Sequence, residues 1–252
     1  MKIGIVGYGH VGQAMHQLFK DAVIFDLHKN IGSMADINSC HTAFICVPTP
    51  MNADGSCHTD VVEDVIKKCE CHLLILRSTV PVGFTRKMVE KYQKHIVFQP
   101  EYYGETVAHP FVNLSERQWL AFGGTRQASH LAIKTYQQVI NSNVRIYQAS
   151  SDEVEMAKYM ENAYLATKVI FCNEFYQLCQ KMGVDYHQVR EIWTADPRIG
   201  TSHTFVYEDN LGYGGSCLPK DISSIQNQAK KLNCDTTLID AVINKNVQLK
   251  GL

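Results

Sequence analysis

The residues best suited to take part in a chemical reaction lie in the segment GYGGSCLPKD, residues 212–221. Pro219 suits the first turn of a helix, so Cys217 is expected just ahead of a helix N-terminus. There the helix dipole and the neighbouring Lys220 favour the thiolate over the thiol, which is the setting of a nucleophile. Asp221, in the same first turn, could orient water or accept a proton. A buried cysteine in a tight turn is the alternative interpretation.

A glycine loop near the N-terminus is typical of a dinucleotide site. Gly7, Gly9 and Gly12 form GxGxxG directly after an expected strand at residues 3–6 and before an expected helix at residues 11–19. Gly7 permits a tight turn, Gly9 lets a pyrophosphate approach the backbone, and Gly12 lets helix and strand pack closely. A glycine-rich turn of another α/β protein is the alternative.

The next expected strand ends in Asp26, and this acid indicates which cofactor binds. Its carboxylate can accept hydrogen bonds from ribose hydroxyls and would repel a 2′-phosphate, so NAD is favoured over NADP, although the nearby Lys29 softens the inference. The expected cofactor contacts are Gly7, Gly9, His10, Val11, Gly12, Asp26, Lys29, Val47, Pro48, Thr79, Glu105 and Lys220.

A thiolate beside NAD can carry out two oxidations at one carbon. Hydride transfer from a primary alcohol gives an aldehyde, and the thiolate adds to it to form a thiohemiacetal that still carries a removable hydride. A second NAD takes that hydride and leaves a thioester, which water hydrolyses to an acid. The reactive aldehyde is then never released.

Several polar residues could support this chemistry. Lys158 and Asn162 are four residues apart on an expected helix, so they share one face. An ammonium and an amide there can stabilise an alkoxide or oxyanion, although lysines on helices are usually just solvated. Arg198 precedes the glycine-rich segment and could meet an anionic ligand. Three more candidates follow expected strands, where open α/β sheets hold their sites: Thr79, Glu101 and Glu105.

An α/β fold must position these residues. Apolar strand-like runs are expected at residues 3–6, 23–25, 43–47, 73–76, 96–98, 119–122 and 144–147. Helical stretches between them lie at residues 63–69, 85–92 and 127–140, whereas residues 31–39 are short for a full crossover. Strand–helix alternation predicts a parallel sheet covered on both faces, which is a Rossmann-type doubly wound fold.

The pattern changes after residue 147, where a long helix over residues 152–182 is expected to form a spine. Ser150 and Glu153 make a capping box at its start, and Gly183 can end it. No convincing strand follows. We therefore predict an NAD-binding domain over residues 1–150 and a small all-α substrate and dimerisation domain over residues 151–252.

Composition narrows the class of protein. The chain has 252 residues with 45% apolar residues, and 24 Lys and Arg against 25 Asp and Glu leave a net charge of −1. This excludes a disordered chain and argues against nucleic-acid binding. No apolar run reaches membrane-span length and no signal peptide is expected, which favours the cytoplasm.

The nine cysteines are expected to be mostly reduced thiols. One cluster invites a zinc interpretation, but its CxC spacing and the amphipathic helix between its halves argue against it, so no metal is predicted. The cluster consists of Cys57, His58, Cys69, Cys71 and His72.

Taken together, these residues resemble the UDP-glucose/GDP-mannose dehydrogenase family of four-electron nucleotide-sugar oxidoreductases, within the 6-phosphogluconate dehydrogenase-like superfamily. The resemblance implies that Cys217 is the nucleophile, Asp221 its partner in water activation, and Lys158 with Asn162 the oxyanion-stabilising pair. It implies that Thr79 orders the catalytic water and that Glu105 assists thioester hydrolysis. The implied substrate contacts are Glu101, Tyr102, Lys158, Asn162, Arg198, Tyr213, Gly214 and Cys217.

The sequence departs from the family pattern in three places. The stretch between Asp26 and Phe44 is shorter, PEYYGET has Gly104 where the family usually has an arginine, and a chain ending at Leu252 is expected to lack the C-terminal domain that holds most of the nucleotide. We therefore expect weak nucleotide binding. The last helix, from residue 237, is expected to expose an apolar stripe of Leu238, Ile239, Val242 and Val247.

The resemblance predicts NAD-dependent oxidation of a nucleotide-sugar primary alcohol to the carboxylate, with UDP-glucose to UDP-glucuronate as the leading case in polysaccharide biosynthesis. It also predicts a homodimer, in which Arg198 reaches the neighbouring subunit's site, or a separate nucleotide-binding subunit. The alternatives are a two-electron NAD-dependent alcohol dehydrogenase with a non-nucleotide substrate, and an NAD-binding subunit that needs a partner chain.

Overall fold

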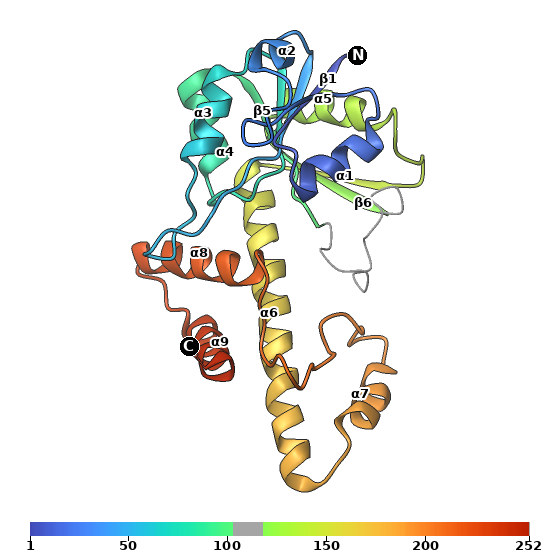
Figure 1. Cartoon of the computed structure of the whole chain (residues 1–252), viewed down its shortest axis with the longest axis vertical. Coiled ribbons are helices and arrows are strands. Elements are labelled where there is room, and N and C mark those ends of the chain that lie inside the picture. The colour runs from blue at the N-terminus through green and yellow to red at the C-terminus, as the bar shows by residue number, and fades with distance from the viewer. Residues whose placement is uncertain (103–117, 252) are drawn as a thin grey trace. The chain divides into compact units, whose positions relative to one another are not determined.

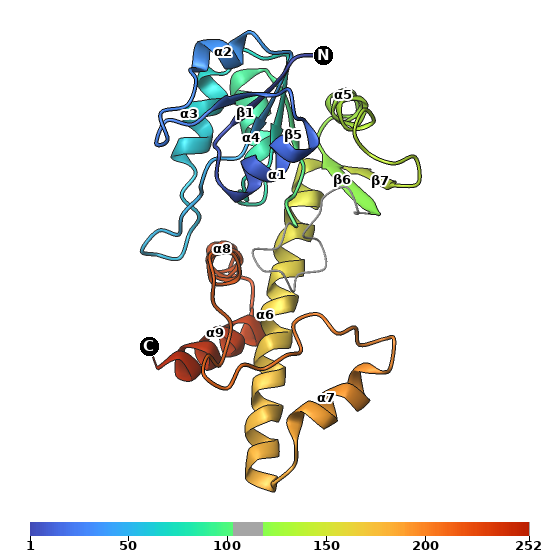
Figure 2. The ribbon, with the colours of Figure 1, turned by 45° about the vertical axis from the view of Figure 1, so that its right-hand side comes forward.

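The computed structural model describes residues 1–102 and 118–251 (Figures 1 and 2). The chain divides into two compact units. The first comprises Met1–Pro50 and Cys57–Lys158, and the second comprises Met51–Ser56 and Tyr159–Leu252. Each unit has its own hydrophobic core, and the predicted functional domains at residues 1–150 and 151–252 stay predictions.

The first unit contains a seven-stranded sheet in the order β2-β1-β3-β4-β5-β6-β7. Its strands lie close to the runs that the sequence predicts, so the doubly wound α/β fold is confirmed. They are β1 (Ile3–Val6), β2 (Val23–Phe25), β3 (Thr42–Ile45), β4 (Leu73–Leu76), β5 (His95–Phe98), β6 (Trp119–Gly123) and β7 (Arg145–Ala149).

The sheet is mostly parallel, as the sequence predicts, but one pair of strands departs from this pattern. Strands β1 to β5 are parallel, and β6 and β7 are parallel to each other, but β6 pairs antiparallel with β5 through Phe98 and Gly123. Parallel pairing of neighbours requires a crossover, usually a helix. The part of the β5–β6 connection that the structure describes, residues 99–102 and 118, contains no helix.

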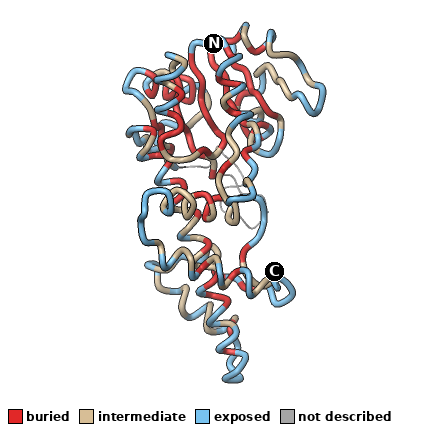
Figure 3. Tube along the Cα trace, turned by 90° about the vertical axis from the view of Figure 1, so that its left-hand side faces the viewer, coloured by how far each residue is buried: buried red, intermediate tan, exposed pale blue. Residues whose placement is uncertain are grey.

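Helices cover both faces of the sheet, and the strand residues alternate between the two layers. One layer packs on α1 (His10–Leu18) and α5 (Arg126–Tyr136) and includes Ile5, Phe44 and Ile75. The other packs on α2 (Met34–Asn38), α3 (Asp60–Lys68) and α4 (Phe84–Tyr92), and includes Val6, Ile45 and Leu76. The strands β1, β3 and β4 are buried along their whole length, and the buried residues in Figure 3 are concentrated in the first unit. The carboxyl ends of the strands are thereby held on a rigid frame.

The long helix α6 spans Ser151–Met182 and begins and ends at the predicted signals. The Ser150 backbone N–H and hydroxyl donate to Glu153 Oε2 at 2.8 and 2.7 Å, and the Glu153 N–H donates back to Ser150 Oγ at 3.3 Å. Gly183 follows the last helical residue with φ 68°. No helix in the described part of the chain is long and apolar enough to cross a membrane.

The second unit is helical and consists mainly of α6 from Tyr159 onward with α7 (Tyr186–Thr194), α8 (Leu218–Lys231) and α9 (Thr237–Lys250). The apolar stripe predicted on α9 is only partly exposed. Val242 is buried with Ala166 and Ile222, and Ile239 packs against the same cluster, because α9 closes the core of this unit. Leu238 and Val247 remain exposed, at 66% and 41%.

Candidate active site

The glycine loop between β1 and α1 leaves open space at its middle glycine. A Cβ on Gly7, whose φ is 90°, would lie 2.7 Å from the Cys46 carbonyl oxygen, and one on Gly12 would lie 2.0 Å from the Gly7 carbonyl oxygen. Both glycines are therefore required by the protein's own packing. A Cβ on Gly9, the residue before α1, would meet nothing within 4 Å. This space at a helix N-terminus fits a pyrophosphate.

The carboxylate of Asp26 is fixed at the end of β2 by the backbone. The Tyr8 N–H donates to Asp26 Oδ2 at 2.7 Å, and the Lys29 N–H donates to Oδ1 at 2.9 Å. Burial alone would raise the pKa of Asp26, but these hydrogen bonds outweigh it and the pKa lies below its ordinary value. A carboxylate has about four acceptor sites, so capacity remains for ribose hydroxyls.

Lys29 does not point at Asp26 as a free cation. Its ammonium donates to the Tyr8 carbonyl oxygen at 2.7 Å and lies 5.5 Å from the centre of the Tyr8 ring. Lys29 therefore braces the glycine loop, and this arrangement removes much of the reason to expect it to receive a 2′-phosphate.

The remaining expected cofactor contacts of the first unit follow the same pattern of strand ends and helix start. His10 and Val11 lie in the first turn of α1, Val47 and Pro48 follow β3, and the half-buried Thr79 follows β4. Glu105 lies outside the described residues, and Lys220 belongs to the second unit. The described loop, acid and strand ends fit NAD.

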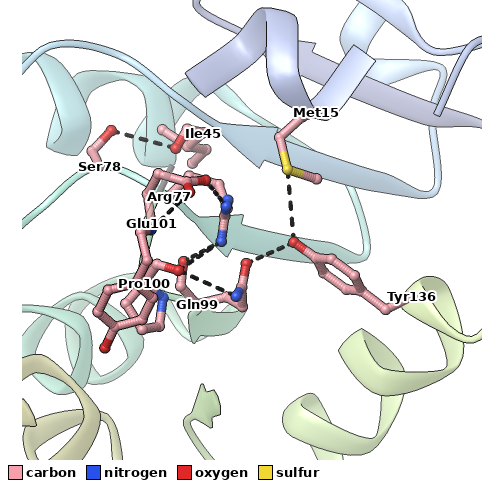
Figure 4. A network of polar contacts seen from close by, with 9 residues as sticks. Met15, Ile45, Arg77, Ser78, Gln99, Pro100, Glu101 and Tyr136 are labelled. Atoms are coloured by element: carbon pink, nitrogen blue, oxygen red, sulfur yellow. Dashed lines mark hydrogen bonds and ion pairs between the residues drawn. The ribbon is translucent and has the colours of Figure 1, made fainter. Parts of the chain in front are cut away.

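A buried arginine, which the sequence did not single out, organises the chain after β5 (Figure 4). The Arg77 guanidinium donates to the carbonyl oxygens of Gln99 at 2.8 Å and Pro100 at 3.0 Å, and it forms an ion pair with Glu101. The Gln99 side chain in turn accepts a hydrogen bond from the Tyr136 hydroxyl at 2.6 Å. Glu101, predicted to contact substrate, is thus bound to a residue of the protein itself.

Tyr102 and Lys158 lie against each other in the first unit. The Lys158 ammonium is 4.5 Å from the centre of the Tyr102 ring, and the two residues are each 7% exposed. The quadrupole of an aromatic ring stabilises a cation held over its face. The pair therefore keeps a positive charge in a mostly desolvated place.

Cys217 lies where the sequence places it, at the N-cap of α8, with Pro219 in the first turn. The residue is exposed, as is only one other of the nine cysteines, Cys234. Its carbonyl oxygen accepts from the Asp221 N–H at 2.9 Å, which starts the helix. The thiol thus combines accessibility with a helix N-terminus, which favours its anionic form.

The carboxylate of Asp221 is held from two sides in the second unit. The Asn162 side-chain amide donates to Asp221 Oδ2 at 2.6 Å, and the Lys220 ammonium pairs with Oδ1 at 2.5 Å. Asp221 is 1% exposed and Asn162 is 5% exposed. A carboxylate fixed in this way, one turn after Cys217, can hold a water molecule or accept its proton.

The other predicted substrate residues of the second unit differ in how far they are buried. The Tyr213 side chain is buried in the core of the second unit, and burial raises its pKa to about 12. Gly214 is exposed on the loop before Cys217. Arg198 is exposed and forms an ion pair with Asp196 at 2.5 Å. The two residues that follow it, Ile199 and Gly200, accept hydrogen bonds from the Lys168 ammonium at their carbonyl oxygens, at 3.0 and 2.8 Å.

The cysteines and histidines that suggest zinc from sequence do not gather around a common point. Cys57, Cys69 and Cys71 are buried and form no disulfide, and no group of three or more metal-ligating side chains occurs within residues 1–102 and 118–251.

Two family profiles match the chain. The profile described as "UDP-glucose/GDP-mannose dehydrogenase family, NAD binding domain" matches residues 26–140, and the one described as the central domain of the same family matches residues 152–248. Together the two ranges take in most of the sequence.

Curated relatives point the same way. A UDP-glucose 6-dehydrogenase of Pseudomonas aeruginosa is 32% identical over 225 residues, which cover 83% of this chain and 49% of the relative. One from Bacillus subtilis is 31% identical, with 83% and 47% covered. One from Streptococcus pneumoniae is 28% identical, with 98% and 73% covered. The chain thus spans about half the length of the first two.

Solved structures share the fold. A UDP-glucose dehydrogenase from Pyrobaculum islandicum has a TM-score of 0.85 at 22% identity, covering 98% of this chain and 68% of that chain. A 3-hydroxyisobutyrate dehydrogenase from Mycobacterium tuberculosis has a TM-score of 0.71 at 18% identity, covering 96% and 91%. At these identities the likeness concerns the fold alone.

Proposed function

Because the chain belongs to the UDP-glucose/GDP-mannose dehydrogenase family, we propose that it oxidises the primary alcohol of a nucleotide sugar to a carboxylate in an NAD-dependent, four-electron reaction. The observation that carries this proposal is the exposed thiol of Cys217 at the N-cap of α8, with the fixed carboxylate of Asp221 one turn further on. A thiol in this position is needed for two oxidations at one carbon but not for one.

NAD would be held by the glycine loop, with its pyrophosphate at Gly9 and the N-terminus of α1 and its adenosine ribose at Asp26. When bound, NAD supplies the hydride acceptor for each of the two oxidations. The Tyr8 and Lys29 N–H groups keep the Asp26 carboxylate oriented, so the ribose meets a preformed acceptor.

Lys158 and Asn162 are proposed to stabilise the oxygen of the reacting carbon as it gains negative charge. Lys158 brings a buried ammonium, and the Asn162 amide is oriented by its hydrogen bond to Asp221. Fixed donors in a desolvated place stabilise such charge without reorganising, which lowers the barrier.

The second oxidation is proposed to proceed on Cys217. Its sulfur adds to the aldehyde carbon, and the resulting thiohemiacetal loses hydride to give a thioester. Water then attacks the thioester carbon, the C–S bond breaks, and the carboxylate leaves with Cys217 regenerated as the thiolate. Asp221 accepts one proton of that water, and the second is released to solvent as the carboxylate forms. Thr79 orients the water, and Glu105, outside the described residues, assists.

We propose a UDP-sugar as the substrate, with UDP-glucose as the leading candidate, because the curated relatives carry that name. The proposed substrate contacts remain Glu101, Tyr102, Arg198, Tyr213 and Gly214. The test is NADH formation with UDP-glucose and identification of the product. A ketone or aldehyde product with one NADH per substrate would instead indicate a two-electron dehydrogenase.

We further propose that the protein acts as a homodimer in the cytoplasm. Exposed apolar side chains on α6 and α9 favour self-association, among them Met160, Tyr164, Leu238 and Val247. None of the nine cysteines forms a disulfide, which suits a reducing compartment. Light scattering at micromolar concentration tests the dimer, and a monomer that turns over UDP-glucose would contradict it.

A further inference from the structure

Two buried asparagines hold successive backbone groups of the loop that leads to Cys217. The Gly212 N–H donates to Asn173 Oδ1 at 3.0 Å, and the Tyr213 N–H donates to Asn246 Oδ1 at 2.7 Å. Asn173 belongs to α6 and Asn246 to α9, and they are 2% and 9% exposed. The loop is therefore tied to two different helices of the second unit at neighbouring residues.

Asn246 packs closely against Gly212. Gly212 has φ 80°, and a Cβ on it would lie 2.5 Å from Asn246 Oδ1, so no other residue leaves room for the hydrogen bond to the next N–H. The Asn173 amide is oriented at its other end, where Nδ2 donates to the Val169 carbonyl oxygen at 2.8 Å. The Asn173 oxygen is thus presented in a set direction.

Beyond these two bonds, the loop that leads to α8 is short and exposed. Gly214, Gly215 and Ser216 are exposed, and Gly215 has φ 77°, so the chain there is glycine-rich and solvent-facing. Cys217 comes four residues after Tyr213 and begins α8. The helix on one side and the two asparagine bonds on the other therefore both contribute to the position of Cys217.

We infer that Asn173 and Asn246 are positioning residues for the Cys217 thiol. The inference rests on the proposed function for its purpose, but not for its test. If either oxygen is removed, one buried N–H loses its acceptor and the glycine-rich loop can move. Cys217 should then spend less time at the N-terminus of α8, where the thiolate is favoured.

The test is the rate of alkylation of Cys217 by iodoacetamide in the full-length folded protein at pH 7, resolved by peptide mass spectrometry. Cys234, the other exposed cysteine, serves as the internal reference. In Asn246→Ala and Asn173→Ala the Cys217 rate should fall about threefold to tenfold, the size expected for loss of a helix-terminus interaction, while the Cys234 rate stays unchanged. Asn246→Asp keeps an oxygen in place and should retain the wild-type rate.

The matched control is Asn244→Ala, which removes an exposed asparagine from the same helix. If Asn246→Ala does not fold, Asn246→Ser takes its place, because its hydroxyl oxygen is drawn back from Tyr213 and should also slow Cys217. A Cys217 rate equal to or above that of wild type in the folded alanine or serine variants would overturn the inference. Lack of turnover by the wild type would count against the proposed function alone.

Discussion

The side-chain amide of Asn162 donates a 2.6 Å hydrogen bond to the buried carboxylate of Asp221, 59 residues further along the chain. The bond joins α6 to the first turn of α8 within the second unit. It orients two residues that the proposed reaction uses for different purposes, one for the oxyanion and one for water. Changing either partner should therefore disturb both.

Asn162→Asp should make folding stability depend on pH. It would place two buried carboxylates in contact, and such a pair cannot both ionise, so one binds a proton above its ordinary pKa. A group whose pKa is raised in the folded state stabilises the fold at low pH, and this stabilisation disappears as the pH rises. The unfolding free energy should therefore fall by about 1.4 kcal/mol or more between pH 5 and 8, relative to wild type. Urea titrations measure this, with the exposed Asn244→Asp as control.

Replacing Asp26 should weaken NAD binding. Asp26→Ala removes the acceptor for the ribose hydroxyls and for two backbone N–H groups, and the loss of hydrogen bonds to a charged group corresponds to about tenfold or more in Kd. Calorimetry with NAD and NADP measures this, and wild type should prefer NAD. The exposed Asp21→Ala is the control, and equal affinities of wild type for NAD and NADP would remove the role given to Asp26.

Removing Arg77 should be far more harmful than removing a surface arginine. Arg77→Met would leave the Glu101 carboxylate, 9% exposed, without its ion pair, at a cost of about 3–5 kcal/mol of unfolding free energy. The matched change is Arg86→Met, because the Arg86–Asp152 pair is exposed and solvent screening leaves it little effect on stability. Similar losses in the two variants would show that the network in Figure 4 is not structural.

Glu155, on α6, should contribute a pH dependence of its own. It accepts from the Gly83 and Thr85 N–H groups at 2.6 and 2.9 Å, but burial raises its pKa from 4.5 to about 7. The protonated Glu155 contributes its full stabilisation to the fold below pH 4.5, and this contribution is lost as the pH rises through about 7. The unfolding free energy should change by about 3 kcal/mol over this range. Asp152 faces the group and adds to the rise. In Glu155→Gln this slope should disappear from urea titrations, whereas the exposed Glu70→Gln should keep it.

The elements that carry strong local signals could be predicted from the sequence. The strands have continuous apolar runs, the glycine loop has fixed spacing, and α6 has a capping box at one end and Gly183 at the other. The position of Cys217 at the start of α8 also follows from Pro219, because that residue acts on its immediate neighbours.

The parts that depend on tertiary contacts could not be predicted. Arginine is rarely buried, so nothing in the sequence marks Arg77 as the partner of Glu101. The pairing of Asn162 with Asp221 joins distant segments and has no local pattern. The reversed direction of β6 and the burial of Val242 on α9 were likewise decided by packing, not by periodicity.

The most direct test of the account is the number of NADH molecules formed per UDP-glucose consumed, together with the product. Wild type should give two NADH and UDP-glucuronate. Cys217→Ser should give at most one NADH in a single turnover and stall at the aldehyde level, because serine cannot form the thiohemiacetal that donates the second hydride. Cys234→Ser, which changes the other exposed cysteine, should behave as wild type. Two NADH and a carboxylate product from Cys217→Ser would contradict the central role of this thiol.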